Sequence, residues 1–108
     1  MCGNGLVMIY IVDIDGTICH TEDGNYINST PIHHRIEYMN NLFDKGNELH
    51  YYTARGSVSG KDWTNFTEQQ LKDWGVKYTT VKTGKQHYHV WIDDKAINAD
   101  TFFKESLT

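Results

Sequence analysis

The sequence has little of what covalent cross-linking, membrane spanning or nucleic-acid binding requires. Only two of its 108 residues are cysteines, Cys2 and Cys19, and no CxxC pair occurs. This usage argues against a disulfide framework and a zinc or redox motif, and it predicts free thiols in a reducing cytoplasm. The longest apolar run, residues 6–12, is far shorter than the ~20 residues of a spanning helix. Its flanks also lack the features of a secretory signal.

Positive charge is scarce as well. Ten Lys and Arg stand against fourteen Asp and Glu, for a net charge of −4, and no basic cluster occurs. This balance argues against a general nucleic-acid or membrane-binding surface. With 39% apolar residues and one proline, the composition is that of a single globular domain over residues 1–108. We expect a small cytoplasmic domain whose function is indicated by where its carboxylates lie.

Hydrophobic patterning predicts alternating strands and helices. Residues 6–12 form a continuous apolar run, which is typical of a strand buried on both faces. Residues 16–30 are polar and aperiodic, and they predict a loop or small flap. Ser29 or Thr30 is expected to cap a helix whose first turn holds Pro31. The other expected elements are the rest of that helix to Phe43, which stops at Gly46, a strand at 48–53, a helix from Trp63 to Trp74, strands at 76–81 and 90–92, and a helix capped by Asn98 that carries Phe102 and Phe103.

This order of elements predicts an α/β fold, a sandwich with a mainly parallel sheet. In such folds, ligands bind beyond the carboxyl ends of the strands. Three of the expected strands end in polar side chains, namely Asp13, Thr53 and Asp93. We therefore expect these side chains to gather at one edge of the sheet and to form a site.

Four aspartates in this pattern predict a cation site. Asp13 and Asp15 follow the first strand, and Asp93 and Asp94 follow the expected strand at 90–92. Like charges repel by about 1 kcal/mol at ~4 Å even in water, so a positive group should offset them. A hard divalent cation with oxygen ligands is the natural candidate. With Lys85 opposite, the four carboxylates predict a phosphate site.

The turn after the second expected strand adds groups that could bind phosphate. The Thr53 hydroxyl and the N–H groups of the turn at Ala54 and Arg55 can donate hydrogen bonds to phosphoryl oxygens. Arg55 could also hold an anionic substrate group with two hydrogen bonds, or it could be a solvated loop charge. Both interpretations of Arg55 remain open from sequence.

These residues resemble the four motifs of the haloacid-dehalogenase-like (HAD) superfamily of phosphohydrolases. The matching positions, in order, are Asp-Ile-Asp-Gly-Thr at 13–17, Thr53, Lys85 and Asp93-Asp94. The resemblance spans residues 7–103 and implies a three-layer Rossmann-like sandwich. Residues 84–98 are further similar to small phosphatases of capsular-polysaccharide biosynthesis, from which Gln86 and His89 depart.

The resemblance implies a mechanism. Asp13 would be the nucleophile that forms an aspartyl-phosphate, and Asp15 would be the general acid and base. Thr53 and Lys85 would hold the phosphoryl oxygens. Mg²⁺ would be bound by Asp13, by the backbone carbonyl of Asp15 and by Asp93, with Asp94 a direct or water-mediated ligand. A small phosphorylated substrate is implied, with sugar phosphate favoured and a nucleotide or nucleic-acid end as the alternative.

The short chain leaves no room for the cap domain that many relatives of this superfamily carry. The segment at 16–30 would then be the only lid, with His20, Glu22, Asn25 and Tyr26 as candidate substrate contacts. An open site of this kind could admit a bulky substrate or be roofed by another copy in a homo-oligomer.

Three other interpretations compete with a phosphatase. A transition-metal site could use His87 and His89 or His33 and His34, although their spacing matches no recognised motif. A response-regulator receiver uses similar residues in a different order along the chain. A non-catalytic relative that only binds phosphate is the third alternative.

Overall fold

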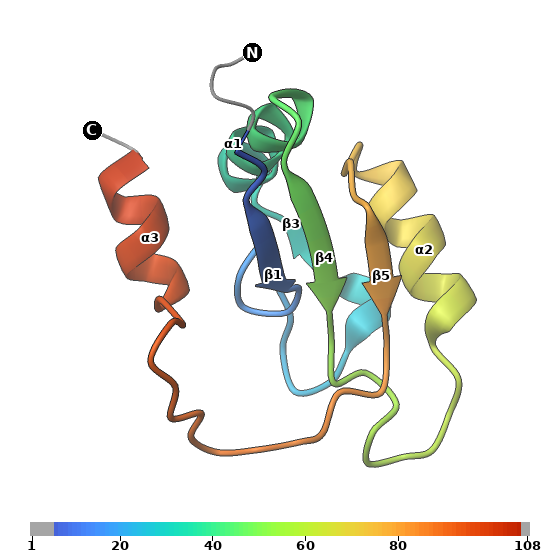
Figure 1. Cartoon of the computed structure of the whole chain (residues 1–108). Helices are drawn as coiled ribbons and strands as arrows, with labels where there is room; N and C mark the ends of the chain where they lie inside the picture. The colour runs from blue at the N-terminus through green and yellow to red at the C-terminus, as the bar shows by residue number, and fades with distance from the viewer. Residues whose placement is uncertain (1–5, 107–108) are drawn as a thin grey trace.

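The fold is a parallel sheet whose one face is covered by helices (Figure 1). The structure is a computed structural model that describes residues 6–106; Cys2 lies outside this range. A three-stranded parallel sheet has the order β1-β4-β5, and an antiparallel pair joins β2 to β3. The elements are β1 (Ile9–Asp13), β2 (Cys19–His20), a 3-10 turn (Tyr26–Asn28), β3 (Thr30–Pro31), α1 (His33–Asp44), β4 (Glu48–Tyr52), α2 (Thr64–Asp73), β5 (Thr80–Lys82) and α3 (Ala99–Ser106).

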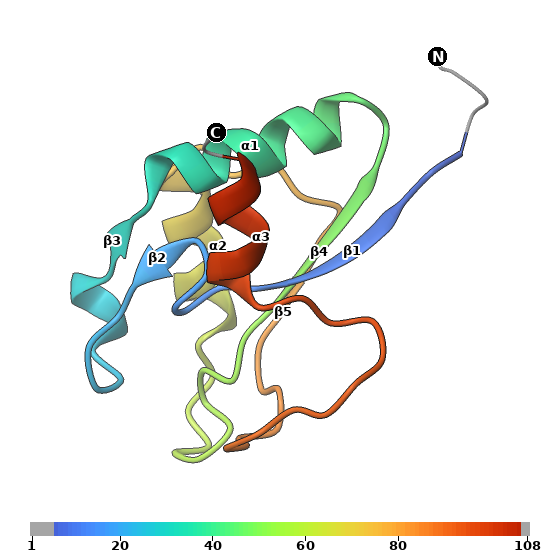
Figure 2. The same ribbon diagram turned by 90° about the vertical axis from the view of Figure 1, so that its left-hand side faces the viewer.

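The core lies between the sheet and the helices. Leu49 and Tyr51 of β4 are buried on the face that α1 and α2 cover, while Ile9 and Ile11 of β1 are 64% and 67% exposed. Figure 2 shows the helices gathered on one side of the strands, with α3 beside α1. The prediction that the first strand is buried on both faces is therefore wrong for the described residues, which show two layers. The third layer of the expected sandwich stays a prediction.

The helices follow the predicted periodicity because their apolar residues face the sheet. Ile36 and Met39 of α1 and Leu71 of α2 are buried. Asn98 caps α3 as predicted, since its Oδ1 accepts hydrogen bonds from the N–H groups of the first turn. None of the described helices is long and apolar enough to span a membrane.

The predicted start of α1 is wrong. Neither Ser29 nor Thr30 caps the helix, and Pro31 lies outside it. Pro31 instead pairs with Cys19 in the small antiparallel sheet, and the helix begins at His33 after Ile32, which has no capping side chain. Proline suits the end of a short edge strand as well as a first helical turn, so its presence alone did not decide between them.

The strand expected at residues 90–92 is also absent from the described structure. These residues belong to a long irregular segment, 83–98, between β5 and α3 (orange in Figure 1). Val90, Trp91 and Ile92 are 74%, 54% and 93% exposed, so their apolar character does not reflect burial. A three-residue apolar run is too short for periodicity to identify a strand.

The loop after β4 is shaped by glycines at two positions. Gly56 has a φ of +85° and Gly60 has a φ of +75°. A Cβ on Gly56 would overlap the Lys61 carbonyl oxygen, whereas a Cβ on Gly60 would meet nothing. The Gly60 N–H also donates to the Gly56 carbonyl at 2.9 Å, which holds the two ends of the turn together. This loop follows Arg55 directly and therefore determines where that side chain begins.

We predict that Gly56→Ala destabilises the protein more than Gly60→Ala does. Both substitutions place an alanine at positive φ, at a cost of about 1–2 kcal/mol. Only Gly56→Ala adds overpacking, which typically costs about 1–3 kcal/mol more. Urea unfolding of both variants checks this, and equal losses of unfolding free energy would contradict it.

Candidate functional site

The carboxyl ends of the three parallel strands meet at one edge of the sheet, where Asp13 and Thr53 lie as predicted, but the third strand is β5 and not the expected strand before Asp93. Asp13 ends β1 and pairs in register with Tyr52, the last residue of β4. Thr53 directly follows Tyr52. Lys85 follows β5, and its N–H donates to the Thr53 carbonyl at 2.9 Å. Asp13, Asp15 and Lys85 line a cavity of about 360 Å³, together with Ala54 and Arg55 from the turn after Thr53.

Asp13 and Lys85 form an ion pair at the cavity. Lys85 Nζ donates to Asp13 Oδ1 at 3.1 Å, and the Lys85 side chain is only 10% exposed, while that of Asp13 is 40% exposed. Burial raises the pKa of Asp13 above its ordinary value, and the charge and hydrogen bond of Lys85 offset only part of this rise. The site thus holds a partly exposed carboxylate beside a cation that can neutralise an incoming anion.

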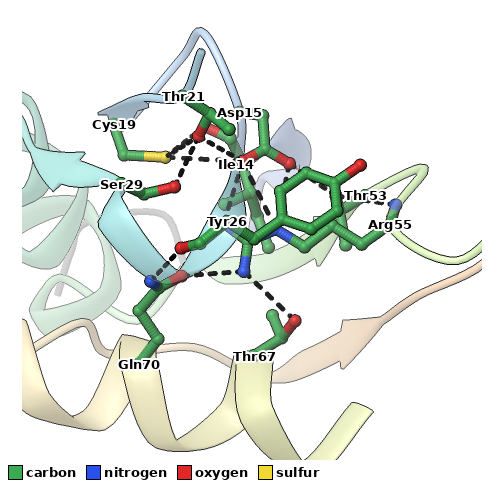
Figure 3. Close-up of polar contacts among 10 residues, drawn as sticks. All are labelled: Ile14, Asp15, Cys19, Thr21, Tyr26, Ser29, Thr53, Arg55, Thr67 and Gln70. Carbon is green, nitrogen blue, oxygen red and sulfur yellow. Dashed lines mark hydrogen bonds and ion pairs between the residues drawn. The ribbon is translucent and has the colours of Figure 1, made fainter. Parts of the chain in front are cut away.

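Asp15 is held by a buried arginine (Figure 3). Arg55 donates to Asp15 through Nε, at 3.1 Å to Oδ2, and through Nη2, at 2.8 Å to Oδ1. The Arg55 side chain is fully buried. Thr53 Oγ1 donates to Asp15 Oδ2 at 2.9 Å, and Thr21 Oγ1 donates to Oδ1 at 2.7 Å. Both oxygens of the Asp15 carboxylate therefore accept hydrogen bonds from the protein.

These contacts give Asp15 a pKa opposite in direction to that of Asp13. Burial alone would raise the pKa of Asp15, but the hydrogen bonds from Arg55, Thr21 and Thr53 and the charge of Arg55 lower it below its ordinary value. The two carboxyl groups, separated by one residue, thus differ in pKa because burial outweighs Lys85 at Asp13, whereas hydrogen-bond donors and the charge of Arg55 outweigh burial at Asp15.

Two polar residues of α2 complete the Arg55 network, and sequence reasoning missed both. Arg55 Nη1 donates to Gln70 Oε1 at 2.7 Å and to Thr67 Oγ1 at 3.2 Å. Thr67 and Gln70 are buried, and Gln70 Nε2 donates to the carbonyl of Tyr26, whose ring lies 4.7 Å from the Arg55 guanidinium carbon. Their signal was present, since they share a helical face with the buried Leu71. Arg55 is therefore not a solvated loop charge, because it is buried and its guanidinium donates to Asp15, Thr67 and Gln70. Its predicted contact with a substrate group stays a prediction, since Arg55 also lines the cavity.

Residues 16–30, the predicted flap, form one side of the cavity. Thr21, Gly24 and Tyr26 line it. Of the four flap residues predicted as substrate contacts, Tyr26 lines the cavity, while His20, Glu22 and Asn25 do not. The Cys19 thiol, within the flap, is buried and contacts Thr21 Oγ1 at 3.5 Å. Burial raises its pKa to about 11, so it is not a reactive thiolate.

Asp93 and Asp94 are not brought to the other two aspartates. They lie in the segment 83–98, where Asp93 accepts hydrogen bonds from the Lys95 N–H at 2.6 Å and from Trp91 Nε1 at 3.1 Å. The first of these bonds lowers the pKa of Asp93 most. Within residues 6–106, no group of three or more His, Cys, Asp or Glu side chains is arranged to hold a metal ion. The four-aspartate cation site therefore stays a prediction.

The histidines singled out by sequence lie apart in the fold. His33 begins α1, followed by His34, and both are exposed. His87 lines the cavity, and its ring lies 5.4 Å from that of His89. Among residues 6–106, these histidines belong to no group of three or more side chains that could hold a metal ion, so a transition-metal centre stays a prediction.

Comparison with known proteins finds a solved structure of similar fold but assigns no function. The chain matches no protein-family profile and no curated protein. It is similar to the crystal structure of a structural-genomics target from Vibrio cholerae, with a TM-score of 0.76 and 27% sequence identity. The match covers 89% of this chain and 87% of that chain, so the two share the α/β fold over most of their lengths.

We predict that Asp15→Asn destabilises the protein far more than Asp44→Asn does. Asp15→Asn leaves the fully buried Arg55 without its counterion, which typically costs about 3–5 kcal/mol. Asp44 pairs with Lys77 at the surface, where an ion pair contributes about 1 kcal/mol or less. Urea unfolding at pH 7 measures both losses.

The pH dependence of this difference follows from the lowered pKa of Asp15. A carboxyl whose pKa is lower in the folded state stabilises the fold above its unfolded pKa of about 3.9. That contribution is lost as pH falls through the folded pKa. The gap between the wild type and Asp15→Asn should therefore be full above about pH 5 and narrow in acid; a gap that widens in acid would contradict the assignment.

We further predict that the pKa values of the two site carboxyls are shifted in opposite directions from that of an ordinary aspartate. In a ¹³C NMR titration, the Asp13 pKa should lie above the reference value of about 3.9 and the Asp15 pKa below it. Lys85→Met removes the positive charge beside Asp13 and should raise the Asp13 pKa further. A lowered Asp13 pKa in this variant would show that Lys85 does not favour the carboxylate.

Proposed function

We propose that this protein is a magnesium-dependent phosphomonoester hydrolase that acts through an aspartyl-phosphate on Asp13. The observation that carries the proposal is the ion pair between a partly exposed Asp13 and the nearly buried Lys85 at the strand ends. A carboxylate beside a fixed cation, in a cavity open to solvent, supplies both a nucleophile and charge neutralisation for a phosphoryl group. The proposal includes a HAD-like Rossmann sandwich without a cap domain.

In the first half of the proposed reaction, an Asp13 carboxylate oxygen attacks phosphorus in line. The bond between phosphorus and the leaving oxygen breaks, and that oxygen takes a proton from Asp15. Lys85 neutralises charge on the phosphoryl oxygens, and the N–H groups of the turn at Ala54 can add hydrogen bonds. Because Arg55 favours the ionised form of Asp15, protonation of Asp15 is the demanding condition for this half at neutral pH.

In the second half, water attacks the phosphorus of the aspartyl-phosphate. Asp15, now ionised, accepts a proton from this water, and the bond between phosphorus and the Asp13 oxygen breaks. Inorganic phosphate leaves, and the enzyme regains a carboxylate at Asp13 and a proton at Asp15. The contacts from Arg55, Thr53 and Thr21 suit this half directly, since they favour the ionised Asp15 that must act as base.

The oxygen donors at the cavity fit Mg²⁺ in kind. Magnesium is commonly bound through one or two carboxylates together with substrate phosphate and water. Asp13 and the backbone carbonyl of Asp15 would hold it, whereas both Asp15 carboxylate oxygens are already occupied by protein donors. Asp93 or Asp94 would join them only if the segment 83–98 moved. When bound, the ion would neutralise negative charge on the phosphoryl group.

We predict that the purified protein releases inorganic phosphate from p-nitrophenyl phosphate and that Mg²⁺ is required. Asp13→Asn should lower kcat at least ~10³-fold, because the amide cannot serve as the nucleophile. Asp73→Asn, at an exposed position of α2, is the matched control and should keep wild-type activity. A phosphate-release assay with and without chelator measures all three.

The same assay separates the alternatives. Undiminished turnover in Asp13→Asn would overturn the nucleophile assignment. A wild type that binds phosphate but hydrolyses no member of a panel of sugar phosphates and nucleotides would instead be the non-catalytic relative. Loss of activity on dilution would indicate that a second copy roofs the open cavity.

A further inference from the structure

A second cavity adjoins the one that holds Asp13. Its volume is about 350 Å³, and Lys85 and Tyr88 line both cavities. The Lys85 ammonium, which pairs with Asp13 on one side, therefore lies at the boundary between the two. A phosphate ester bound with its phosphorus at Asp13 would extend its leaving group past Lys85, and the second cavity is one of the spaces into which it can go.

Aromatic rings dominate the wall of the second cavity. The rings of Tyr52, Tyr88 and Trp91 lie 5.7, 5.3 and 5.9 Å from Lys85 Nζ. Tyr88 and Trp91 meet at 5.2 Å with their planes 70° apart, so they form a corner. Tyr88 is 41% exposed and Trp91 is 54% exposed. Large aromatic surfaces beside a polar site are thus left open to a ligand.

The remaining wall favours a flat aromatic ligand over a polyhydroxylated one. Val90, Ile92 and Gln86 complete the described lining, which contains no carboxylate. The Trp91 indole N–H is already used, because it donates to Asp93 Oδ2. A sugar ring placed here would keep most of its hydroxyls in water, because Val90, Trp91 and Ile92 are largely exposed, and it would offer the rings no flat π face to stack on. An aromatic base would instead stack on a ring face, which needs no hydrogen bond.

We propose that the second cavity binds the nucleobase of a nucleoside monophosphate whose phosphate lies at Asp13 and Lys85. This inference rests on the proposed function and names its substrate class. The net charge of −4 and the lack of a basic cluster favour a free nucleotide over the end of a nucleic-acid chain. Lys85 would then contact the phosphoryl oxygens, and the rings of Tyr88 and Trp91 that surround its ammonium would contact the base.

Binding of a nucleoside without phosphate tests the base subsite separately from catalysis. Adenosine and ribose serve as a matched pair of probes, titrated into the wild-type protein and followed by the indole N–H signals of its three tryptophans in NMR. We expect adenosine to shift the Trp91 signal and to bind at least roughly 10-fold more tightly than ribose, the size of a stacking contribution. Equal binding, or a shift confined to Trp63 or Trp74, would overturn the proposal.

Two variants of one residue complete the test. Trp91→Phe retains an aromatic ring and should bind adenosine within a few-fold of the wild type, whereas Trp91→Leu should lose roughly 10-fold or more. Thermal melting checks that both variants fold, as expected because Trp91 is exposed. Equal adenosine affinity in the two variants would overturn the assignment of Trp91.

The outcome for the subsite is distinct from that for the hydrolase. Selective adenosine binding in a protein that cleaves no phosphate ester would uphold the base subsite and remove the proposed reaction. Magnesium-dependent cleavage of p-nitrophenyl phosphate without any preference of adenosine over ribose would uphold the reaction and overturn the subsite.

Discussion

The buried ion pair between Arg55 and Asp15 is the constraint on which the site depends. A guanidinium taken fully out of water loses a large hydration free energy, which is recovered only when its donors are matched by acceptors. Asp15, Thr67 and Gln70 supply those acceptors from two separate elements. The end of β1, the turn after β4 and one face of α2 must therefore keep fixed relative positions for the pair to persist. The polar network thus organises the same strand ends that the apolar core brings together.

Environment rather than residue type distinguishes the two site carboxyls. Asp13 and Asp15 are chemically identical and separated by one residue, yet burial dominates at the first and hydrogen-bond donors dominate at the second. Such a separation of pKa values is how two like groups acquire different roles in acid–base chemistry. In the hydrolase that we propose, the partly exposed carboxyl forms the covalent bond and the enclosed one exchanges protons.

Strand ends could be predicted from the sequence because the signal was local and strong. A continuous apolar run that stops at Asp13 indicated a strand and the place where it ends, although not its exposed face, and parallel pairing then brings Thr53 and Lys85 alongside. The partners of Arg55 could not be predicted in the same way. The helical face that Thr67 and Gln70 share with Leu71 indicates that they can be buried, but their pairing with Arg55 follows from a contact with a side chain far away in sequence.

The errors in prediction came from short segments that satisfy two structures equally well. Pro31 fits a first helical turn and an edge strand, and tertiary pairing with Cys19 decided between them. Residues 90–92 have the composition of a strand, but the structure leaves them exposed. Asp93 and Asp94 depended on that strand for their expected position, so a local error displaced half of the predicted cation site.

The two aspartates also differ in how stiffly they are held. Asp15 is clamped by side chains from the flap, from the turn after β4 and, through Arg55, from α2. Asp13 ends β1, which among residues 6–106 lies at the edge of the parallel sheet beside β4. A nucleophile has to travel toward phosphorus as the new bond forms, whereas a proton donor has to stay in register with the leaving oxygen. In the hydrolase that we propose, the edge strand would leave the nucleophile room to approach phosphorus, and the donors around Asp15 would keep the proton donor in place.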